Sequence, residues 1–459
     1  MAYIGIQPAE KFTSFATQEF STSATTSYTL DHAVTNENEI ALFVNNVRQQ
    51  PGSGKAYTAT GTALTLSAAT ASTDTMYCVF LGRALQTVTP VTNSITNAML
   101  SENSQSQIFN NNFRNIIING DMSIAQRGTS TTGIGTSNGY FSCDRWKTGT
   151  SGTNTLRFTQ SQSTDVPSGQ GFPFSLKMDC TTADASLSSG DRIEISPRFE
   201  GQNLQYLKKG TSSAESLTLS FWVKSNKTGT YIVELFDTNN TRQISQAYTI
   251  DSASTWEKKT LTFAGDTTGV FTNDNNASLQ VSWFLAAGSN MTSGTLSTTW
   301  TSNTNANRAV GQVNLADSTS NEWYITGVQL EAGTSATNFE FLPTDVNLKR
   351  CYRYYEVIVS GNTKVIAPAI TYTASTAAGI INFKTTKRAT PTLDAVTGSD
   401  YYEFFRAGAT PEYSSFSIGD ASVNLCYISG DSASNTTAGY AGYLQTNNAS
   451  SFIAFDSEL

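Results

Sequence analysis

Short alternations of apolar and polar residues run along most of this chain and predict β-strands. In residues 217–223 every second side chain is apolar, and the same period of two recurs at 279–285; Ile40, Leu42 and Val44 have the same spacing within an apolar run. Because successive side chains of a strand point to opposite faces, each of these strands has one apolar face. Stretches rich in Ser, Thr, Asn and Gly lie between them and favour turns. We therefore predict an all-β fold in which stacked sheets bury their apolar faces.

The order of these signals predicts several domains in series. A chain of 459 residues exceeds a single core, since cores stop growing near about 250–300 residues. In the first domain the pair Asn45-Asn46 follows an alternating strand and tolerates positive φ, so it predicts a hairpin turn. We predict an amino-terminal β domain over 1–90, a neck or linker over 91–113, a larger β domain over 114–348 and a carboxy-terminal β domain over 349–459.

Composition and charge exclude several classes of function. Only 14% of the residues are charged and the net charge is -8, so the chain lacks the basic surface that nucleic acid requires. No run of about 18 apolar residues is present to cross a bilayer. The first residues also lack the basic and apolar regions of a signal peptide. We expect a soluble protein that is made in a cytoplasm and does not insert into membranes.

Cysteine and histidine usage argues against metal and nucleophilic chemistry. The five cysteines are widely spaced, without a zinc pattern or a disulfide framework, and we interpret them as small buried hydrophobes. His32 is the single histidine, so a Ser-His-Asp or Cys-His site is not expected. We expect no cofactor. A structural calcium ion held by carboxylates and carbonyls stays open, without assignable ligands.

Glycoside hydrolysis requires two carboxylates about 5–10 Å apart in a cleft. Glu194 and Glu234 lie on predicted strands, but nothing in the sequence marks them as a pair. We interpret them as solvated or ion-paired surface acids. The chain also lacks the short regular coils of a parallel β-helix, which many tailspike enzymes use. We therefore expect no enzymatic activity.

Sugar binding needs an aromatic face together with amide and carboxylate groups that bridge hydroxyls. By strand alternation, one sheet face is predicted to carry Trp222, Glu234, Gln280 and Gln329. The last predicted domain contains a second group of candidates, for which a sugar-contact surface and a trimer core both stay open as interpretations. The group consists of Tyr401, Tyr402, Phe404, Phe405, Arg406 and Tyr413.

Other conspicuous residues have a structural interpretation. We expect Asp144 and Arg145 to form a structural pair. The remaining tryptophans that stand in or near predicted strands are expected in the core, namely Trp146, Trp256, Trp283 and Trp323.

Three segments, taken in order, resemble tail fibre proteins of podovirus-like and cyanobacterial phages. The first comprises Tyr28-Thr-Leu30, Ile40-Ala-Leu-Phe-Val-Asn-Asn-Val-Arg-Gln-Gln-Pro-Gly52, Tyr57-Thr58 and Phe80-Leu-Gly82. The second is Asn115-Ile-Ile-Ile-Asn-Gly-Asp-Met-Ser-Ile-Ala-Gln-Arg-Gly128, followed by Asp144-Arg-Trp146. The third is Trp323-Tyr-Ile-Thr-Gly-Val-Gln-Leu-Glu-Ala-Gly333, running into Phe339-Glu-Phe-Leu-Pro343 and Cys351-Tyr-Arg-Tyr-Tyr355.

The resemblance implies a structural role on a virion. It implies an elongated homotrimer of β-sandwich or jelly-roll domains in series, with a jelly roll similar to carbohydrate-binding modules between the second and third segments. The amino-terminal domain would attach to phage tail or fibre-adaptor proteins, and the outer domains would adhere to host polysaccharide or lipopolysaccharide. The family carries a tryptophan at the position of Trp222, which makes packing between sheets or subunits an alternative to sugar contact.

Two other functions stay open. One is a tailspike depolymerase that cuts capsule or lipopolysaccharide. The other is a virion decoration or adaptor protein that does not bind a receptor.

Overall fold

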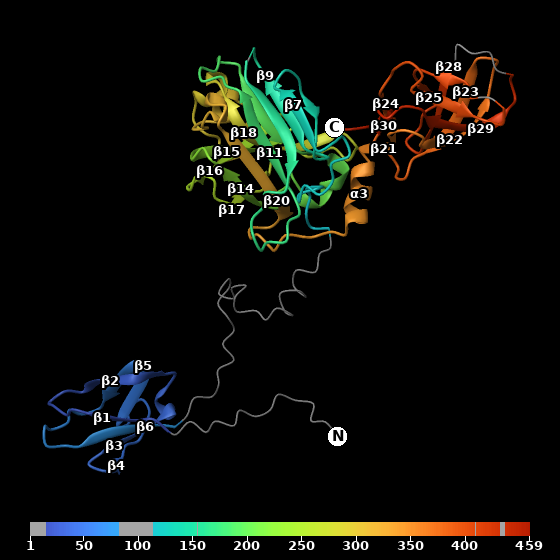
Figure 1. Cartoon of the computed structure of the whole chain (residues 1–459). Helices are drawn as coiled ribbons and strands as arrows, with labels where there is room; N and C mark the ends of the chain where they lie inside the picture. The colour runs from blue at the N-terminus through green and yellow to red at the C-terminus, as the bar shows by residue number, and fades with distance from the viewer. Residues whose placement is uncertain (1–14, 82–112, 154, 409, 432–436) are drawn as a thin grey trace, which may run out of the picture. The chain divides into compact units, whose positions relative to one another are not determined.

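The computed structural model in Figure 1 describes residues 15–81, 113–153, 155–408, 410–431 and 437–459. Contacts divide the chain into two units, Met1–Asn110 and Asn111–Leu459. The all-β prediction is confirmed, because antiparallel sheets dominate both units. Apart from Phe113, the predicted neck at 91–113 lies outside the described residues.

In the first unit a four-stranded sheet, β1-β6-β3-β4, and the pair β2-β5 share one apolar core. Leu42 and Cys78 contribute to that core from the larger sheet, and Leu30 and Leu64 from the smaller. The predicted turn is confirmed, since Asn45 and Asn46 join β3 to β4 with φ of 51° and 65°. The elements are β1 Thr17–Phe20, β2 Ser27–Val34, η1 Glu37–Glu39, β3 Ile40–Val44, β4 Val47–Arg48, β5 Tyr57–Leu66 and β6 Met76–Phe80.

The second unit begins with a large β-sandwich. One sheet has the order β17-β14-β20-β11-β10-β7, and the other has the order β19-β16-β15-β18-β12-β9-β8, with β13 also paired to β18. The strands are β7 Ser130–Ile134, β8 Gly139–Tyr140, β9 Lys147–Ser151, β10 Arg157–Ser163, β11 Ser175–Thr182, β12 Arg192–Ser196, β13 Arg198–Glu200, β14 Leu217–Ser225, β15 Gly229–Asp237, β16 Arg242–Ile250, β17 Glu257–Phe263, β18 Ala277–Ala287, β19 Thr301–Ser302 and β20 Glu322–Ala332.

Short helices connect these strands: η3 Gly201–Asn203, η4 Gln205–Leu207, α2 Ser289–Thr292, η5 Asn305–Asn307 and η6 Leu315–Asp317. The order of the central strands identifies a jelly roll. Taken along the chain, β11, β12, β14, β15, β16, β17, β18 and β20 change sheet at every step except from β15 to β16, so that β11-β20-β14-β17 face β12-β18-β15-β16. That is the double Greek key of a jelly roll.

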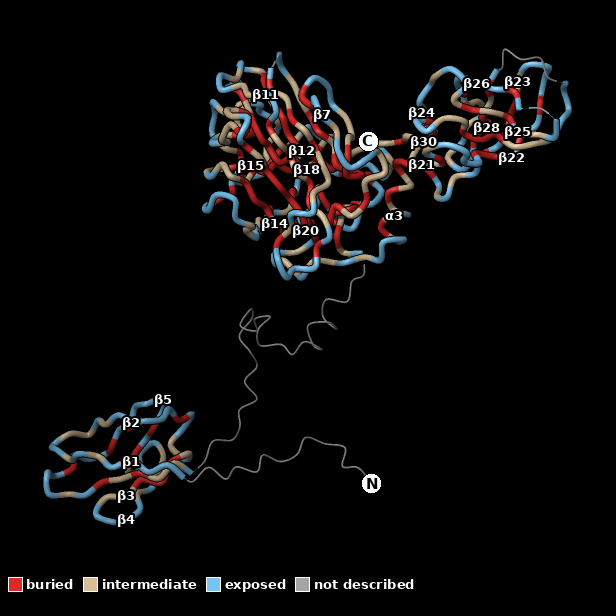
Figure 2. The backbone as a smooth tube through the Cα atoms, in the orientation of Figure 1, coloured by how far each residue is buried: buried red, intermediate tan, exposed pale blue. Residues whose placement is uncertain are grey.

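The sandwich core lies between the two sheets, and Figure 2 shows its buried stretches along the central strands. Leu217, Leu219, Phe221 and Val223 point inward, as their alternation predicts. Three of the tryptophans expected in the core are fully buried, namely Trp146, Trp283 and Trp323. The interpretation of the cysteines is also confirmed, since all five are buried and unpaired.

Two segments that carry the family resemblance lie side by side, although about 200 residues separate them. The Ile116 amide donates to the Leu330 carbonyl at 2.9 Å, and the Asn115 side-chain amide donates to the Val328 carbonyl at 3.0 Å. At Gly120 a Cβ would stand only 2.2 Å from the Val328 carbonyl oxygen, so only glycine fits there. Both segments therefore have a packing role in the sandwich.

The carboxy-terminal part of the second unit contains helix α3 and two further sheets, β21-β30-β24 and β26-β25-β29-β22-β23-β28-β27. Neither α-helix of the described residues has the length and apolarity to cross a lipid bilayer. The elements are α3 Thr344–Tyr352, β21 Tyr355–Ser360, β22 Val365–Thr371, β23 Thr376–Asn382, β24 Thr392–Ala395, β25 Tyr402–Phe405, β26 Glu412–Tyr413, β27 Ser417–Gly419, β28 Leu425–Asp431, β29 Ala441–Thr446 and β30 Phe452–Asp456.

Candidate functional site

The four side chains expected on one sheet face are divided between the two sheets. Trp222 on β14 and Gln329 on β20 belong to one sheet, whereas Glu234 on β15 and Gln280 on β18 belong to the other. The expectation of a shared face is therefore wrong. Strand alternation separates inward from outward residues, but it does not determine which strands share a sheet.

On the sheet that contains β15 and β18, the outer face is closed. Glu234 is fully buried in a bidentate ion pair with Arg308, whose Nε and Nη2 lie 2.8 and 2.5 Å from the carboxylate oxygens. Burial raises the pKa of Glu234, and the hydrogen bonds and charge of Arg308 oppose that rise. Apolar residues around α2, among them Met291 and Ala309, pack over this face. Glu234 is therefore a structural residue.

The neighbouring acid on this face is also structural. Gln280 donates to Glu194 at 3.1 Å and to Ser282 at 2.7 Å, and Arg192 lies 3.9 Å from the Glu194 carboxylate. The ion-paired interpretation of Glu194 and Glu234 holds, but their expected surface position is wrong, because both are buried.

The outer face of the other sheet is partly exposed, and cross-strand register builds a row of four side chains there. Lys224 stands opposite Tyr324, and Tyr324 stands opposite Lys177. Trp256, directly before β17, extends the row beyond Lys224. The expectation that Trp256 lies in the core is wrong, since it is partly exposed on the outer face. We call Trp256, Lys224, Tyr324 and Lys177 the aromatic row.

Cations and rings alternate along the aromatic row. The Lys224 ammonium lies 4.3 Å from the centroid of Tyr324 and 5.5 Å from that of Trp256. Lys177 approaches Tyr324 at 5.4 Å. Such cation–π contacts hold the rings in a fixed orientation.

Two carboxylates, Asp165 and Glu322, each contact one lysine and one aromatic side chain of the row. Asp165 accepts a hydrogen bond from Trp256 Nε1 at 3.0 Å and forms an ion pair with Lys224. Desolvation raises the pKa of Asp165, but the hydrogen bonds from Lys224 and Trp256 outweigh it and hold that pKa below its ordinary value.

At the other end of the row, Glu322 pairs with Lys177 at 2.8 Å and accepts a hydrogen bond from the Tyr324 hydroxyl at 2.9 Å. These contacts likewise lower the pKa of Glu322 against its desolvation. Desolvation and the bond to Glu322 raise the pKa of Tyr324 to about 12. Tyr324 and Lys224 are themselves buried, at 5% and 8% exposed, so the row presents to solvent the ring of Trp256 together with Lys177, Asp165 and Glu322.

Trp222 lies beside the row, opposite Lys258 and Thr326, and is partly exposed. Gln329 shares this sheet but is buried, where it donates to Glu331 at 2.9 Å and to Thr337 at 3.0 Å. Of the four expected side chains, Trp222 is thus the one beside the open part of this face. The signal that was missed is the register, which places Trp256 on the outer face two residues before Lys258.

The aromatic candidates of the last domain are divided in a similar way. Tyr402 and Tyr413 are buried in the apolar core of the carboxy-terminal sheets, so neither ring has a face open to a ligand. Tyr401 packs against that core and is only partly exposed. Arg406 is partly exposed and lies over the ring of Tyr440 at 4.3 Å. The sequence could not separate these residues because all stand in or near short strands.

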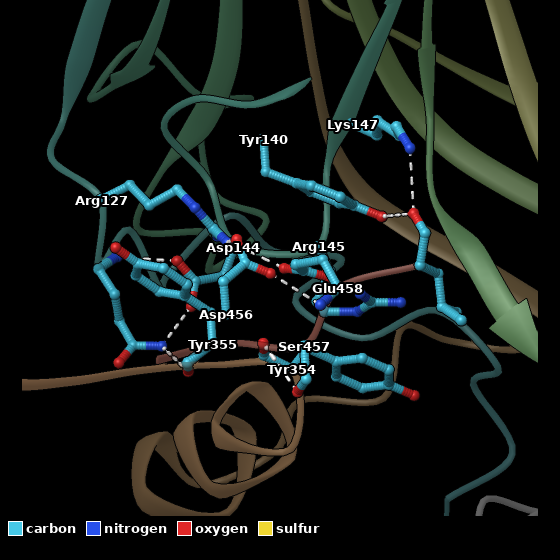
Figure 3. Close-up of polar contacts among 12 residues, drawn as sticks. Arg127, Tyr140, Asp144, Arg145, Lys147, Tyr354, Tyr355, Asp456, Ser457 and Glu458 are labelled. Carbon is cyan, nitrogen blue, oxygen red and sulfur yellow. Dashed lines mark hydrogen bonds and ion pairs between the residues drawn. The ribbon is translucent and has the colours of Figure 1, made fainter. Parts of the chain in front are cut away.

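A second charged and aromatic cluster lies where the last residues of the chain meet the sandwich (Figure 3). Arg127 stacks on Tyr355 at 3.4 Å and Arg145 on Tyr354 at 3.5 Å, while both arginines form ion pairs with Glu458. We call these five residues the junction cluster.

The junction cluster has a structural role. Tyr140 and Lys147 donate to the main-chain oxygen of Leu459 at 2.9 and 3.1 Å, which ties the end of β30 to the sandwich. Asp144 and Arg145 are both buried and structural, as expected. Their partners differ from the expectation, since Arg145 pairs with Glu458 and Asp144 accepts the Gln126 amide at 2.8 Å. Burial raises the pKa of Asp144, an effect that the bonds from Gln126 oppose.

Among the described residues, no group of three or more His, Cys, Asp or Glu side chains is arranged to hold a metal ion.

Comparison with known proteins gives distant structural similarities. No protein-family model and no curated protein sequence matches the chain. The enzymatically active domain of tailspike protein 4 from bacteriophage CBA120 is similar over 48% of this chain and 21% of its own length, with 14% identity and a TM-score of 0.26. A putative sugar-binding protein from Bacteroides thetaiotaomicron is similar over 48% of this chain and 99% of its own length, with 14% identity and a TM-score of 0.25.

A carbohydrate-binding module, TmCBM61, solved with β-1,4-galactotriose, is similar over 48% of this chain and 99% of its own length, with 11% identity and a TM-score of 0.24. At these TM-scores the fold assignment depends on the strand order described above and not on the similarities.

Proposed function

We propose that the chain is a non-enzymatic tail fibre protein of a phage virion that adheres to glycans on the host cell surface. The observation that carries this proposal is a pair of partly exposed rings on one sheet face, Trp256 of the aromatic row and Trp222 beside it. Ring faces pack against the apolar side of a pyranose, and ionised groups at the ends of the row reach its hydroxyls. The order of the three fibre-like segments supports the virion context, with the amino-terminal domain attached to tail or adaptor proteins.

The geometry favours weak and repeated binding. The aromatic row lies on an outer sheet face and Asp165 remains 44% exposed, so one copy buries little of a sugar. Several copies held on one particle would gain avidity by mass action, provided that their spacing allows simultaneous contact. A shallow site is therefore sufficient for adhesion.

The test removes the two partly exposed indole rings, Trp222 and Trp256. We expect the double substitution Trp222→Ala and Trp256→Ala to weaken binding to host cells or to an array of bacterial surface polysaccharides at least tenfold, which corresponds to about 1.4 kcal/mol. Phe43→Ala, which removes a part-exposed ring from the first unit, is the matched control and should bind normally. Binding by the double variant within twofold of the unmodified protein would contradict the proposed face.

A homotrimer is part of the proposal, and an apolar surface on the carboxy-terminal domain supports it. Ile370, Tyr372 and Ile380 on and beside β22 and β23 are 49%, 68% and 57% exposed. They border a depression of about 690 Å³ whose lining includes no charged residue. Copies of this chain can cover such a face without burying an unpaired charge. We expect the mass in solution to be three times 49.4 kDa, and Ile380→Asp to reduce it. A monomeric mass for the unmodified chain would contradict this part.

A further inference from the structure

A cleft of about 360 Å³ opens next to helix α3 and shares no residue with the aromatic row. Its volume falls within the range of small-ligand pockets, about 300–1,000 Å³. Apolar and polar side chains both contribute to its wall, which consists of Phe113, Asn115, Ile116, Ile118, Phe199, Glu200, Asn203, Tyr206, Arg350, Arg353 and Tyr354.

One cation of the wall, Arg350, forms no ion pair within 4 Å in the described part of the chain, although Glu340 acts on it at longer range. Among the described residues, the polar contact of the Arg350 guanidinium is the main-chain oxygen of Asn115 at 3.4 Å, and the group lies 5.9 Å from the ring of Phe113. Desolvation lowers the pKa of Arg350, so the fold holds a poorly hydrated cation at the edge of the cleft. Binding of an anion to a poorly hydrated cation lowers the free energy of the complex.

The second cation of the wall is already neutralised. Arg353 binds Glu200 in a bidentate pair, with nitrogen–oxygen distances of 2.7 and 2.6 Å. Glu200 also accepts hydrogen bonds from the Tyr354 hydroxyl at 2.5 Å and from Gln202 at 2.6 Å. Because these two charges cancel, Arg350 is the cation of the wall that stays without an ion pair to any described residue. The opposing charge near it is Glu340, whose carboxylate binds the amides of Phe113 and Asn115.

The remaining wall suits a sugar ring. Phe113 and Tyr206 expose 59% and 50% of their surface and offer ring faces, and the exposed amide of Asn203 can bond hydroxyls. Arginine binds carboxylates through two parallel hydrogen bonds, which fixes both the position and the orientation of the ligand. We infer that the cleft binds a sugar unit that carries a carboxylate, such as a uronic acid residue of an acidic polysaccharide. The inference depends on the proposed function, because it names the class of glycan that the protein contacts.

The experiment uses the full-length protein and simple probes. Methyl β-D-glucuronide should give saturation-transfer NMR signals with a dissociation constant in the millimolar range, as expected for one monosaccharide site. Methyl β-D-glucoside, which lacks the carboxylate, should bind at least tenfold more weakly. Inorganic phosphate should not displace the glucuronide, and full displacement would assign the cleft to phosphate groups instead of carboxylates and overturn the inference.

Two variants separate binding from folding. Arg350→Gln should weaken glucuronide binding at least tenfold and leave the unfolding temperature unchanged, because Arg350 supports no ion pair. Lys349→Gln, the matched control, removes an exposed charge from the same helix and should change neither property. Equal binding by Arg350→Gln, or no glucuronide signal with the unmodified protein, would overturn the inference. If host-cell binding still depends on Trp222 and Trp256 in that case, the proposed function stands, so the two failures are distinguishable.

Discussion

The junction cluster and the aromatic row use the same chemistry at different depths. In both, cations stack on tyrosine rings and carboxylates pair with the cations. In the junction the side chains of Arg145 and Glu458 are only 3% and 5% exposed. In the row Lys177 and Glu322 are 24% and 31% exposed. The comparison teaches that burial of the ion pair separates a structural cluster from a contact surface.

Cation type follows the same division. The junction uses arginines, whose planar groups lie 3.4 and 3.5 Å above the tyrosine rings and also reach Glu458. The row uses lysines, which stand farther from their rings; Lys177 stays partly hydrated at 24% exposed, whereas Lys224 is buried. A buried pair has no water to replace a lost partner, whereas a partly exposed group exchanges one partner for another at low cost.

The largest expected effect comes from breaking the junction. Arg145→Met leaves Glu458 with Arg127 alone, at 3.4 Å, in a buried setting. We expect a loss of about 3 kcal/mol in the free energy of unfolding of the second unit, because removal of one partner from a buried ion pair leaves a charge poorly compensated. Urea denaturation followed by tryptophan fluorescence measures it. Lys177→Met in the aromatic row is the control and should cost less than about 1 kcal/mol. If Arg145→Met and Lys177→Met lowered the free energy of unfolding equally, the distinction between a structural junction and a contact surface would be wrong.

A smaller effect is expected for the coupling between each cation and its ring. Double-mutant cycles isolate that coupling from the other contacts of the two residues. For Arg145 and Tyr354, replaced by Met and Leu, we expect about 2 kcal/mol, the value of a desolvated cation–π pair. For Lys177 and Tyr324 we expect about 0.5–1 kcal/mol, because the cation is farther from the ring and better hydrated. A larger coupling in the row than in the junction would reverse the comparison.

The smallest effect concerns pH. The pKa of Asp165 is lower in the folded chain than its ordinary value of 3.8. A carboxylate with a lowered pKa adds stability above its ordinary pKa and loses that contribution as the pH falls through the folded value. The stability difference between the unmodified protein and Asp165→Asn should therefore be largest at neutral pH and shrink below pH 3.8. It should stay under about 1 kcal/mol because Asp165 is 44% exposed.

Asp144 in the junction gives the opposite sign. Burial raises its pKa, so the folded state binds a proton more readily than the unfolded state does. Relative to Asp144→Asn, the unmodified protein should gain stability as the pH falls from neutral towards the ordinary pKa of an aspartate, about 3.9. Thermal unfolding at a series of pH values measures both variants. If the stability difference changed with pH in the same direction for Asp165→Asn and for Asp144→Asn, the contrast between an exposed row and a buried junction would be wrong.

The sequence by itself determined the local features of this protein. The period of two in residues 217–223 fixed which side chains face the core, because alternation is a property of the extended backbone. The Asn45-Asn46 pair fixed a hairpin turn for an equally local reason, its tolerance of positive φ. Three of the four tryptophans expected in the core, Trp146, Trp283 and Trp323, are buried, but the same reasoning from ring size placed Trp256 there wrongly.

Tertiary structure alone decided which of these local features meet. It placed Glu234 and Gln280 on one sheet and Trp222 on the other, and it brought Trp256 into line with Lys224 on the outer face. Arg145 and Glu458 form a pair across 313 positions of the chain. Contacts at such separation depend on how whole sheets pack and on where connections cross between them, and a pattern that spans a few residues carries no information about either.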